Sequence, residues 1–188
     1  MAFLSDLFGK KIPADQTEEI LARHLTGDFR IFPMAETPAT ARHAAEVAKR
    51  LGVQFPPEFV AHLCGRFPGI HVEAKEEVWP RPKQFDVGPF WSFLYAVRTY
   101  TAADSSEDWM RLEVVGSKFR QDTGLSVVPV LKRIGDANCF CVDGKGELSE
   151  FDHETQALTP VEGGFFQLFE NQIRDLAERT AKKKSSIG

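Results

Sequence analysis

The chain has 188 residues, of which 43% are hydrophobic and 27% are charged, a composition typical of a folded protein. This length most simply makes one domain with a substantial core. The formal net charge of −4 argues against a general nucleic-acid-binding protein, which would carry a basic face. A mildly acidic balance is compatible with a basic partner, but many proteins without one share it.

The cysteines and the N-terminus indicate a cytoplasmic protein. Cys64, Cys139 and Cys141 are odd in number and form no disulfide framework, which favours a reducing compartment. The N-terminus does not read as a signal peptide, because Lys10 and Lys11 follow the apolar residues instead of preceding them. No stretch approaches the ~20 apolar residues that cross a bilayer, so we expect no membrane partner.

Helix signals dominate the first third of the chain. Residues 1–13 are expected to form an N-terminal arm, either a short amphipathic helix or a loosely docked terminus. Thr17 and the pair Thr37-Pro38 suit helix starts, and glycines mark helix ends. These signals predict helices over residues 17–25, 37–51 and 55–64.

Two strands and a helix are predicted in the middle of the chain. Residues 70–79 alternate in part and favour a half-exposed strand, whereas the prolines of residues 80–90 favour a loop. Residues 93–100 are rich in aromatics and predict a second strand. A helix capped by Ser105 or Ser106 is expected to run to about Arg120. One face of that helix would carry Trp109, Leu112, Val115 and Phe119.

The C-terminal third is the most informative part of the sequence. Residues 125–152 read as three short apolar strands joined by tight turns at Gly135-Asp136 and at residues 143–146. An amphipathic helix is predicted over residues 164–182, and the polar tail 183–188 is expected to be disordered. The predicted fold is therefore α+β: a single domain over residues 14–182, with one mostly antiparallel sheet, a C-terminal three-strand meander and about five helices.

This region also carries a resemblance. The strand Val-Val-Pro-Val at 127–130, the segment Gly-Asp-Ala-Asn-Cys-Phe-Cys-Val-Asp at 135–143 and the helix Phe-Phe-Gln-Leu-Phe-Glu-Asn-Gln-Ile at 165–173 resemble the SUKH superfamily. That family includes fungal cell-wall assembly regulators of the Smi/Knr type and many bacterial proteins. Gln54-Phe55-Pro56-Pro57-Glu58-Phe59 is similar to its helix start, although Cys64-Gly65 stands where the family usually has Asn-Gly. The resemblance covers residues 55–177 and implies the same α+β fold.

No residue pattern in the chain points clearly to chemistry. Cys139-x-Cys141 could suggest a metal site, but residues i and i+2 of a strand share a side, and structural zinc sites prefer a wider spacing. Asp152-His153-Glu154 places a histidine among carboxylates, but the sequence names no nucleophile or metal within reach, and a turn is the favoured explanation. We expect buried structural cysteines, no catalytic residues, no metal and no cofactor.

The best candidates for function are aromatic and basic residues around the 80–90 loop. Tryptophan, tyrosine and arginine are enriched at binding hot spots, although several of these rings could belong to the core instead. The predicted partner-binding residues are Trp79, Arg81, Phe85, Phe90, Trp91 and Arg98.

The sequence thus supports three hypotheses of unequal weight. The first is a non-enzymatic protein-binding module, because the resemblance implies that bacterial members act as immunity proteins. Such proteins bind and neutralise a cognate toxin, here through steric and electrostatic masking by an acidic, aromatic-rimmed surface. The alternative is an intracellular regulatory or scaffold protein of the cell-wall regulator type. An enzyme acting on a small molecule has the least support, and the partner and oligomeric state stay open.

Overall fold

The computed structural model describes residues 11–81, 90–104 and 106–187. Within these residues the chain forms five α-helices and one open, seven-stranded, all-antiparallel sheet, which confirms the α+β prediction. Each strand pairs with the next one along the chain, so the whole sheet is a single meander. Its strands are β1 (Phe29–Pro33), β2 (Ile70–Ala74), β3 (Ala96–Thr99), β4 (Val128–Arg133), β5 (Cys139–Val142), β6 (Leu148–Asp152) and β7 (Ala157–Pro160).

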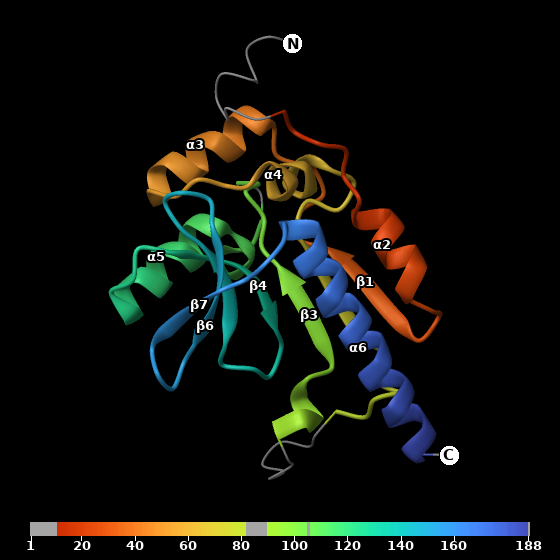
Figure 1. Ribbon diagram of the computed structural model, residues 1–188. Helices are drawn as coiled ribbons and strands as arrows, with labels where there is room; N and C mark the ends of the chain where they lie inside the picture. The colour runs from red at the N-terminus through yellow and green to blue at the C-terminus, as the bar shows by residue number, and fades with distance from the viewer. Residues whose placement is uncertain (1–10, 82–89, 105, 188) are drawn as a thin grey trace.

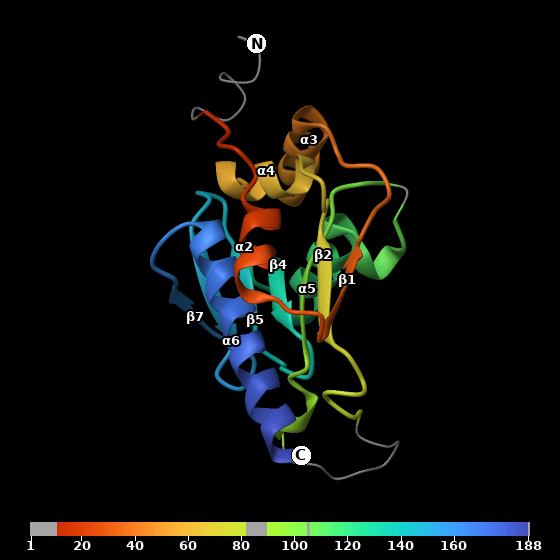
Figure 2. The same ribbon diagram turned by 90° about the vertical axis from the view of Figure 1, so that its right-hand side faces the viewer.

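The helices cover both faces of the sheet and one of its ends. They are α2 (Thr17–His24), α3 (Ala41–Leu51), α4 (Pro57–Cys64), α5 (Leu112–Thr123) and α6 (Phe165–Ile187), with short 3-10 turns η1 (Phe90–Phe93) and η2 (Asp108–Met110). The long α6 lies along one face with α2 beside it, whereas α5 lies on the opposite side and α3 and α4 close the upper end (Figure 1, Figure 2). No helix in the described residues is both long and apolar enough to cross a bilayer.

The main core lies between the sheet and α6. Val97, Leu131 and Phe140 project from the sheet into it. Phe165 and Phe169 fill it from α6, and both rings are fully buried. The Glu58 carboxylate of α4 accepts a hydrogen bond from the backbone N–H of Phe166 at 2.9 Å, which satisfies a donor in the first turn of α6.

A buried histidine joins three elements of this core. His62 of α4 is fully buried, and its Nδ1 lies 2.8 Å from the hydroxyl of Thr17. Its Nε2 lies 2.8 Å from the hydroxyl of Thr99 on β3. Thr17 donates its own proton to Asp15 at 2.6 Å, and Thr99 accepts from the backbone N–H of Ile70 at 2.9 Å. These partners fix the direction of the hydrogen bonds. The Thr99 hydroxyl donates to His62 Nε2, and His62 Nδ1 donates to the Thr17 hydroxyl, so the imidazole is a neutral ring.

The turns of the C-terminal meander follow the sequence prediction. Gly135 and Gly146 adopt positive φ values of 87° and 82°. A Cβ atom at Gly135 would lie 2.5 Å from the Cβ of Phe93, so only glycine fits between the β4–β5 turn and η1. The predicted turn at Asp152 is also present, because its carboxylate accepts the backbone N–H of Thr155 at 2.8 Å.

Several predicted boundaries and caps are wrong. Strands β1 and β7, at the two edges of the sheet, were not predicted, because both are short and mostly exposed and therefore lack a buried alternation. Thr17 is the first residue of α2 and not its cap: Gln16 stands at the N-cap position without a side-chain cap hydrogen bond, and Asp15 accepts the N–H of Thr17 at 3.0 Å. Helix α3 begins at Ala41 because Thr40, rather than Thr37, accepts the N–H of His43 at 3.1 Å.

The C-terminal tail is also more ordered than the sequence suggested. Helix α6 continues to Ile187 instead of ending at Lys182. Lys184 in the added turn forms an ion pair with Asp28 at 2.9 Å, which ties the helix to the loop before β1. The predicted arm over residues 1–13 lies mostly outside the described residues.

Candidate functional site

A single row of side chains crosses the whole sheet on the face opposite the main core. Pairing between successive strands aligns one residue from each strand, and side chains in one register row share a face. The row reads Phe32, His71, Arg98, Lys132, Cys139, Phe151 and Leu158. Its two ends, Phe32 and Leu158, are exposed, and its middle carries the polar and charged members.

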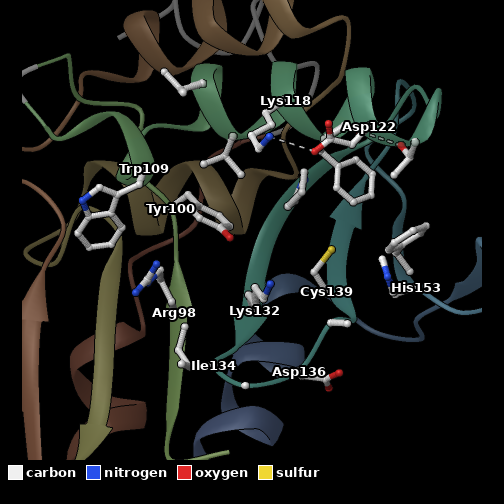
Figure 3. Close-up of a pocket in the computed structure, with 18 of the residues that line it drawn as sticks. Arg98, Tyr100, Trp109, Lys118, Asp122, Lys132, Ile134, Asp136, Cys139 and His153 are labelled. Atoms are coloured by element: carbon white, nitrogen blue, oxygen red, sulfur yellow. Dashed lines mark hydrogen bonds and ion pairs between the residues drawn. The ribbon is translucent and has the colours of Figure 1, made fainter. Parts of the chain in front are cut away.

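Helix α5 stands above the middle of this row and encloses a groove of about 930 Å³. We call this the α5 groove: its floor is Arg98, Lys132, Cys139 and Phe151, and its wall is η2 and α5. Figure 3 shows Lys118 and Asp122 of α5 on one side and Arg98 and Lys132 of the sheet on the other. Phe119 of α5 meets Phe151 of β6 edge to face, with ring centroids 4.9 Å apart, and closes the groove at that point.

An arginine and a tryptophan form one end of the groove. The guanidinium of Arg98 lies over the ring of Trp109, 4.4 Å from its centroid, although the Trp109 side chain is 47% exposed. Arg98 also donates through Nε to His71 Nδ1 at 3.5 Å. Burial lowers the pKa of His71, and the positive charge of Arg98 lowers it further, so the imidazole is neutral at neutral pH.

Two further donors line the floor. The Tyr100 hydroxyl, just after β3, and the Lys132 amino group, on β4, point into the groove (Figure 3). Burial raises the pKa of Tyr100 to about 12, which keeps the hydroxyl protonated as a hydrogen-bond donor. The groove therefore presents arginine, lysine and tyrosine donors beside an exposed indole.

The acidic residues of the lining are already neutralised by the protein itself. Each has a basic partner close in sequence, at 2.6 to 3.4 Å. The pairs are Asp108 with Arg111, Asp122 with Lys118 and Asp136 with Arg133. Arg98 and Lys132 have no carboxylate partner within the described part of the chain, so the unbalanced charge of the groove is positive.

Of the two neighbouring cysteines on β5, Cys139 lies on the floor of the groove. Cys139 and Cys141 are both buried on the same side of β5, with sulfurs 3.6 Å apart, as their spacing predicts. They pack in a small cluster with Val127 and Phe151 rather than in the main core. The Cys141 thiol hydrogen-bonds to Cys139, which lowers the pKa of Cys139 and raises that of Cys141. Within the described residues, no group of three or more His, Cys, Asp or Glu side chains is placed to hold a metal.

Two of the predicted binding residues are engaged inside the protein. Trp79 is 3% exposed and donates its indole N–H to the carbonyl of Ser92 at 3.0 Å, so its ring is not presented to a partner. Arg81 stacks on Tyr95, 3.8 Å from the ring centroid, and donates to the Ala74 carbonyl at 2.6 Å. Both residues thus stabilise the chain after β2.

The remaining predicted residues divide into two groups. Phe85 and the side chains of Phe90 and Trp91 lie outside the described part of the structure. Arg98 lies in the α5 groove, the one predicted residue that the structure places there among those it describes. His153 also borders the groove, but its backbone serves the β6–β7 turn by donating to Asn138 at 2.9 Å.

Sequence reasoning missed Tyr100, Trp109 and Lys132. Trp109 was predicted to share one face of a helix with Leu112 and Phe119, but that helix begins only at Leu112, and Trp109 lies in η2 before it. Lys132 sits in an apolar strand, and its position opposite Arg98 depends on the β3–β4 register. The signal in the sequence that could have identified Lys132 is a basic residue directly after the apolar run Val127–Leu131.

No family model, no curated protein and no solved structure matches the chain.

Proposed function

We propose that this chain is a non-enzymatic protein-binding module, that the α5 groove is its binding surface, and that its partner is a toxin that it neutralises. The observation that carries the proposal is the exposed Trp109 stacked with Arg98 at the mouth of an open groove. Tryptophan, tyrosine and arginine are the residues most enriched at binding hot spots, and Trp109, Tyr100 and Arg98 lie together here.

The packing around the groove supports a binding role. The floor is a hydrogen-bonded sheet and the wall is a helix joined to it through Phe119 and Phe151, so the surface is formed before a partner arrives. A preformed surface loses little conformational entropy on binding, which favours affinity. The choice of a toxin as the partner rests on the resemblance to the SUKH superfamily.

The mechanism proposed from the sequence changes in one respect. Masking by an acidic surface was expected, but the unbalanced charges of the α5 groove are those of Arg98 and Lys132. We therefore expect the partner to supply the acidic residues that meet Arg98 and Lys132. The negative residues behind the net charge of −4 then belong to surfaces away from the groove.

The proposal is tested by partner capture followed by co-expression. The intact chain is immobilised, retained proteins are identified by mass spectrometry, and each is expressed in a bacterial host with and without this chain. The proposal expects one retained protein that arrests growth alone and becomes harmless in the presence of the chain at equal expression. A retained protein that is harmless alone would favour the regulatory alternative, and turnover of a small molecule that Trp109→Ala abolishes would favour an enzyme.

A further inference from the structure

The α5 groove holds three donors that lack an acceptor within the described residues. Arg98 uses only Nε, in the 3.5 Å bond to His71, which leaves both terminal nitrogens of its guanidinium available. Lys132 and Tyr100 make no side-chain hydrogen bond in that part of the chain. An anionic ligand between them would meet a fork of guanidinium donors, an ammonium and a hydroxyl.

The placement of Arg98 and Lys132 is unfavourable without such a ligand. The two residues face each other directly across β3 and β4, and like charges in this position repel. His71 on the next strand accepts a hydrogen bond from Arg98 Nε but has no negative charge to offset the two cations. The acidic side chains around the groove do not relieve the repulsion, because each is paired with another basic residue. A bound anion between the two cations turns this repulsion into attraction.

The size of the groove indicates more than a free anion. A carboxylate occupies a small fraction of about 930 Å³, and the remaining surface includes the exposed indole of Trp109 and the ring of Phe119. The ligand must therefore join a negative group to apolar neighbours. A segment of a protein partner with an acidic side chain beside an apolar residue has this chemistry.

We propose that Arg98, Tyr100 and Lys132 form a carboxylate-binding site that anchors an aspartate or glutamate side chain of the protein partner, with the adjacent apolar residue of the partner packed on Trp109. This inference rests on the proposed function and adds the chemistry that the groove selects. The Arg98 fork takes the two carboxylate oxygens. Lys132, opposite Arg98 on β4, and Tyr100, two residues after Arg98, donate to the same group. The stacking of Arg98 on Trp109 holds the fork at the mouth of the groove.

The test measures which peptide side chains the groove selects, and it does not require the native partner. The full chain is immobilised and used to select binders from a phage-displayed library of random peptides. The same selection is run with the double variant Arg98→Gln/Lys132→Gln and with the matched control Arg42→Gln/Lys49→Gln. The control removes the same two positive charges from exposed positions on α3, outside the groove. Thermal melting verifies that all three proteins are folded.

The proposal expects the intact chain and the control to enrich aspartate and glutamate next to apolar residues, and the double variant to lose this enrichment. In the best peptide, replacing the enriched acidic residue by its amide should weaken binding at least ~10-fold, because a charged hydrogen-bonded pair is removed. Selected peptides without acidic enrichment, or enrichment that survives in the double variant, would overturn the carboxylate site. If the native partner is nevertheless captured and neutralised, only this inference fails and the proposed function stands.

Discussion

The buried His62 should make the protein lose stability between pH 6.5 and pH 3. Complete burial lowers the pKa of His62 from 6.5 to about 3, so the folded protein excludes a proton that the unfolded chain accepts. Stability is therefore full above pH 6.5 and falls as the pH drops through this window. At 1.36 kcal/mol for each pH unit, the loss from pH 7.5 to pH 5 is about 2 kcal/mol.

The hydrogen-bond chain explains why the folded protein resists this proton. His62 Nε2 accepts a hydrogen bond from the Thr99 hydroxyl, and the Thr99 oxygen accepts one from the backbone N–H of Ile70. A proton added to Nε2 would therefore point at the hydroxyl proton of Thr99. The substitution His62→Gln removes the titration while its amide keeps a donor and an acceptor for Thr17 and Thr99. The variant should therefore be less stable than the intact chain at pH 7.5 but lose less stability on acidification.

Urea unfolding at several pH values between 7.5 and 5 measures this directly. The loss of about 2 kcal/mol corresponds to roughly 4 to 8 °C in melting temperature for a protein of this size. His71→Gln serves as the comparison: His71 is only partly buried, which also lowers its pKa, so this variant should keep most of the pH dependence that His62→Gln loses. A flat profile for the intact chain, or an equal slope in His62→Gln, would refute the assignment of His62 as a neutral core residue.

Three further predictions concern packing, charge and the C-terminal turn. Phe169→Ala should cost about 3 to 5 kcal/mol of unfolding free energy, because the ring is fully buried in the main core, and little soluble protein should remain. Lys132→Glu should raise the unfolding free energy by about 1 kcal/mol, because attraction to Arg98 replaces repulsion. The same variant should bind the partner more weakly. A lower unfolding free energy in urea would show that Arg98 and Lys132 do not repel each other. Truncation after Lys182 should cost less than about 1 kcal/mol, because the Lys184–Asp28 ion pair and the Ser185 hydrogen bond to Ala181 that it removes are exposed, and a large fall in melting temperature would contradict this.

The elements with strong local signals could be predicted from the sequence. The turn at Gly135-Asp136 and the stripe of Phe165, Phe169 and Ile173 depend on residues close together in the chain, and both are present as expected. The edge strand β1 could not be predicted, because most of its residues are exposed and it ends in Pro33. Its pairing with β2 across α3 and α4 provides the stabilisation that the local sequence lacks.

The candidate site was harder to predict than the fold. Arg98 and Lys132 are 34 positions apart in sequence, and only the β3–β4 register places them side by side. The density of aromatic residues drew attention to Trp79, but local aromatic content does not distinguish a buried ring from an exposed one. The decisive fact, which basic side chains lack a carboxylate partner, depends on tertiary contacts that no sequence pattern reports.

The most direct test of the account is the affinity of the captured partner for Trp109→Ala. This ring is 47% exposed, so its removal should leave the core and the melting temperature unchanged. Titration calorimetry should show a loss of at least ~2 kcal/mol, or roughly 30-fold in Kd, as expected for a hot-spot tryptophan. The matched control is Ile31→Ala, an exposed apolar residue on the other face of the sheet, which should bind as tightly as the intact chain. Equal affinity for Trp109→Ala and the intact chain would contradict the assignment of the α5 groove as the binding surface.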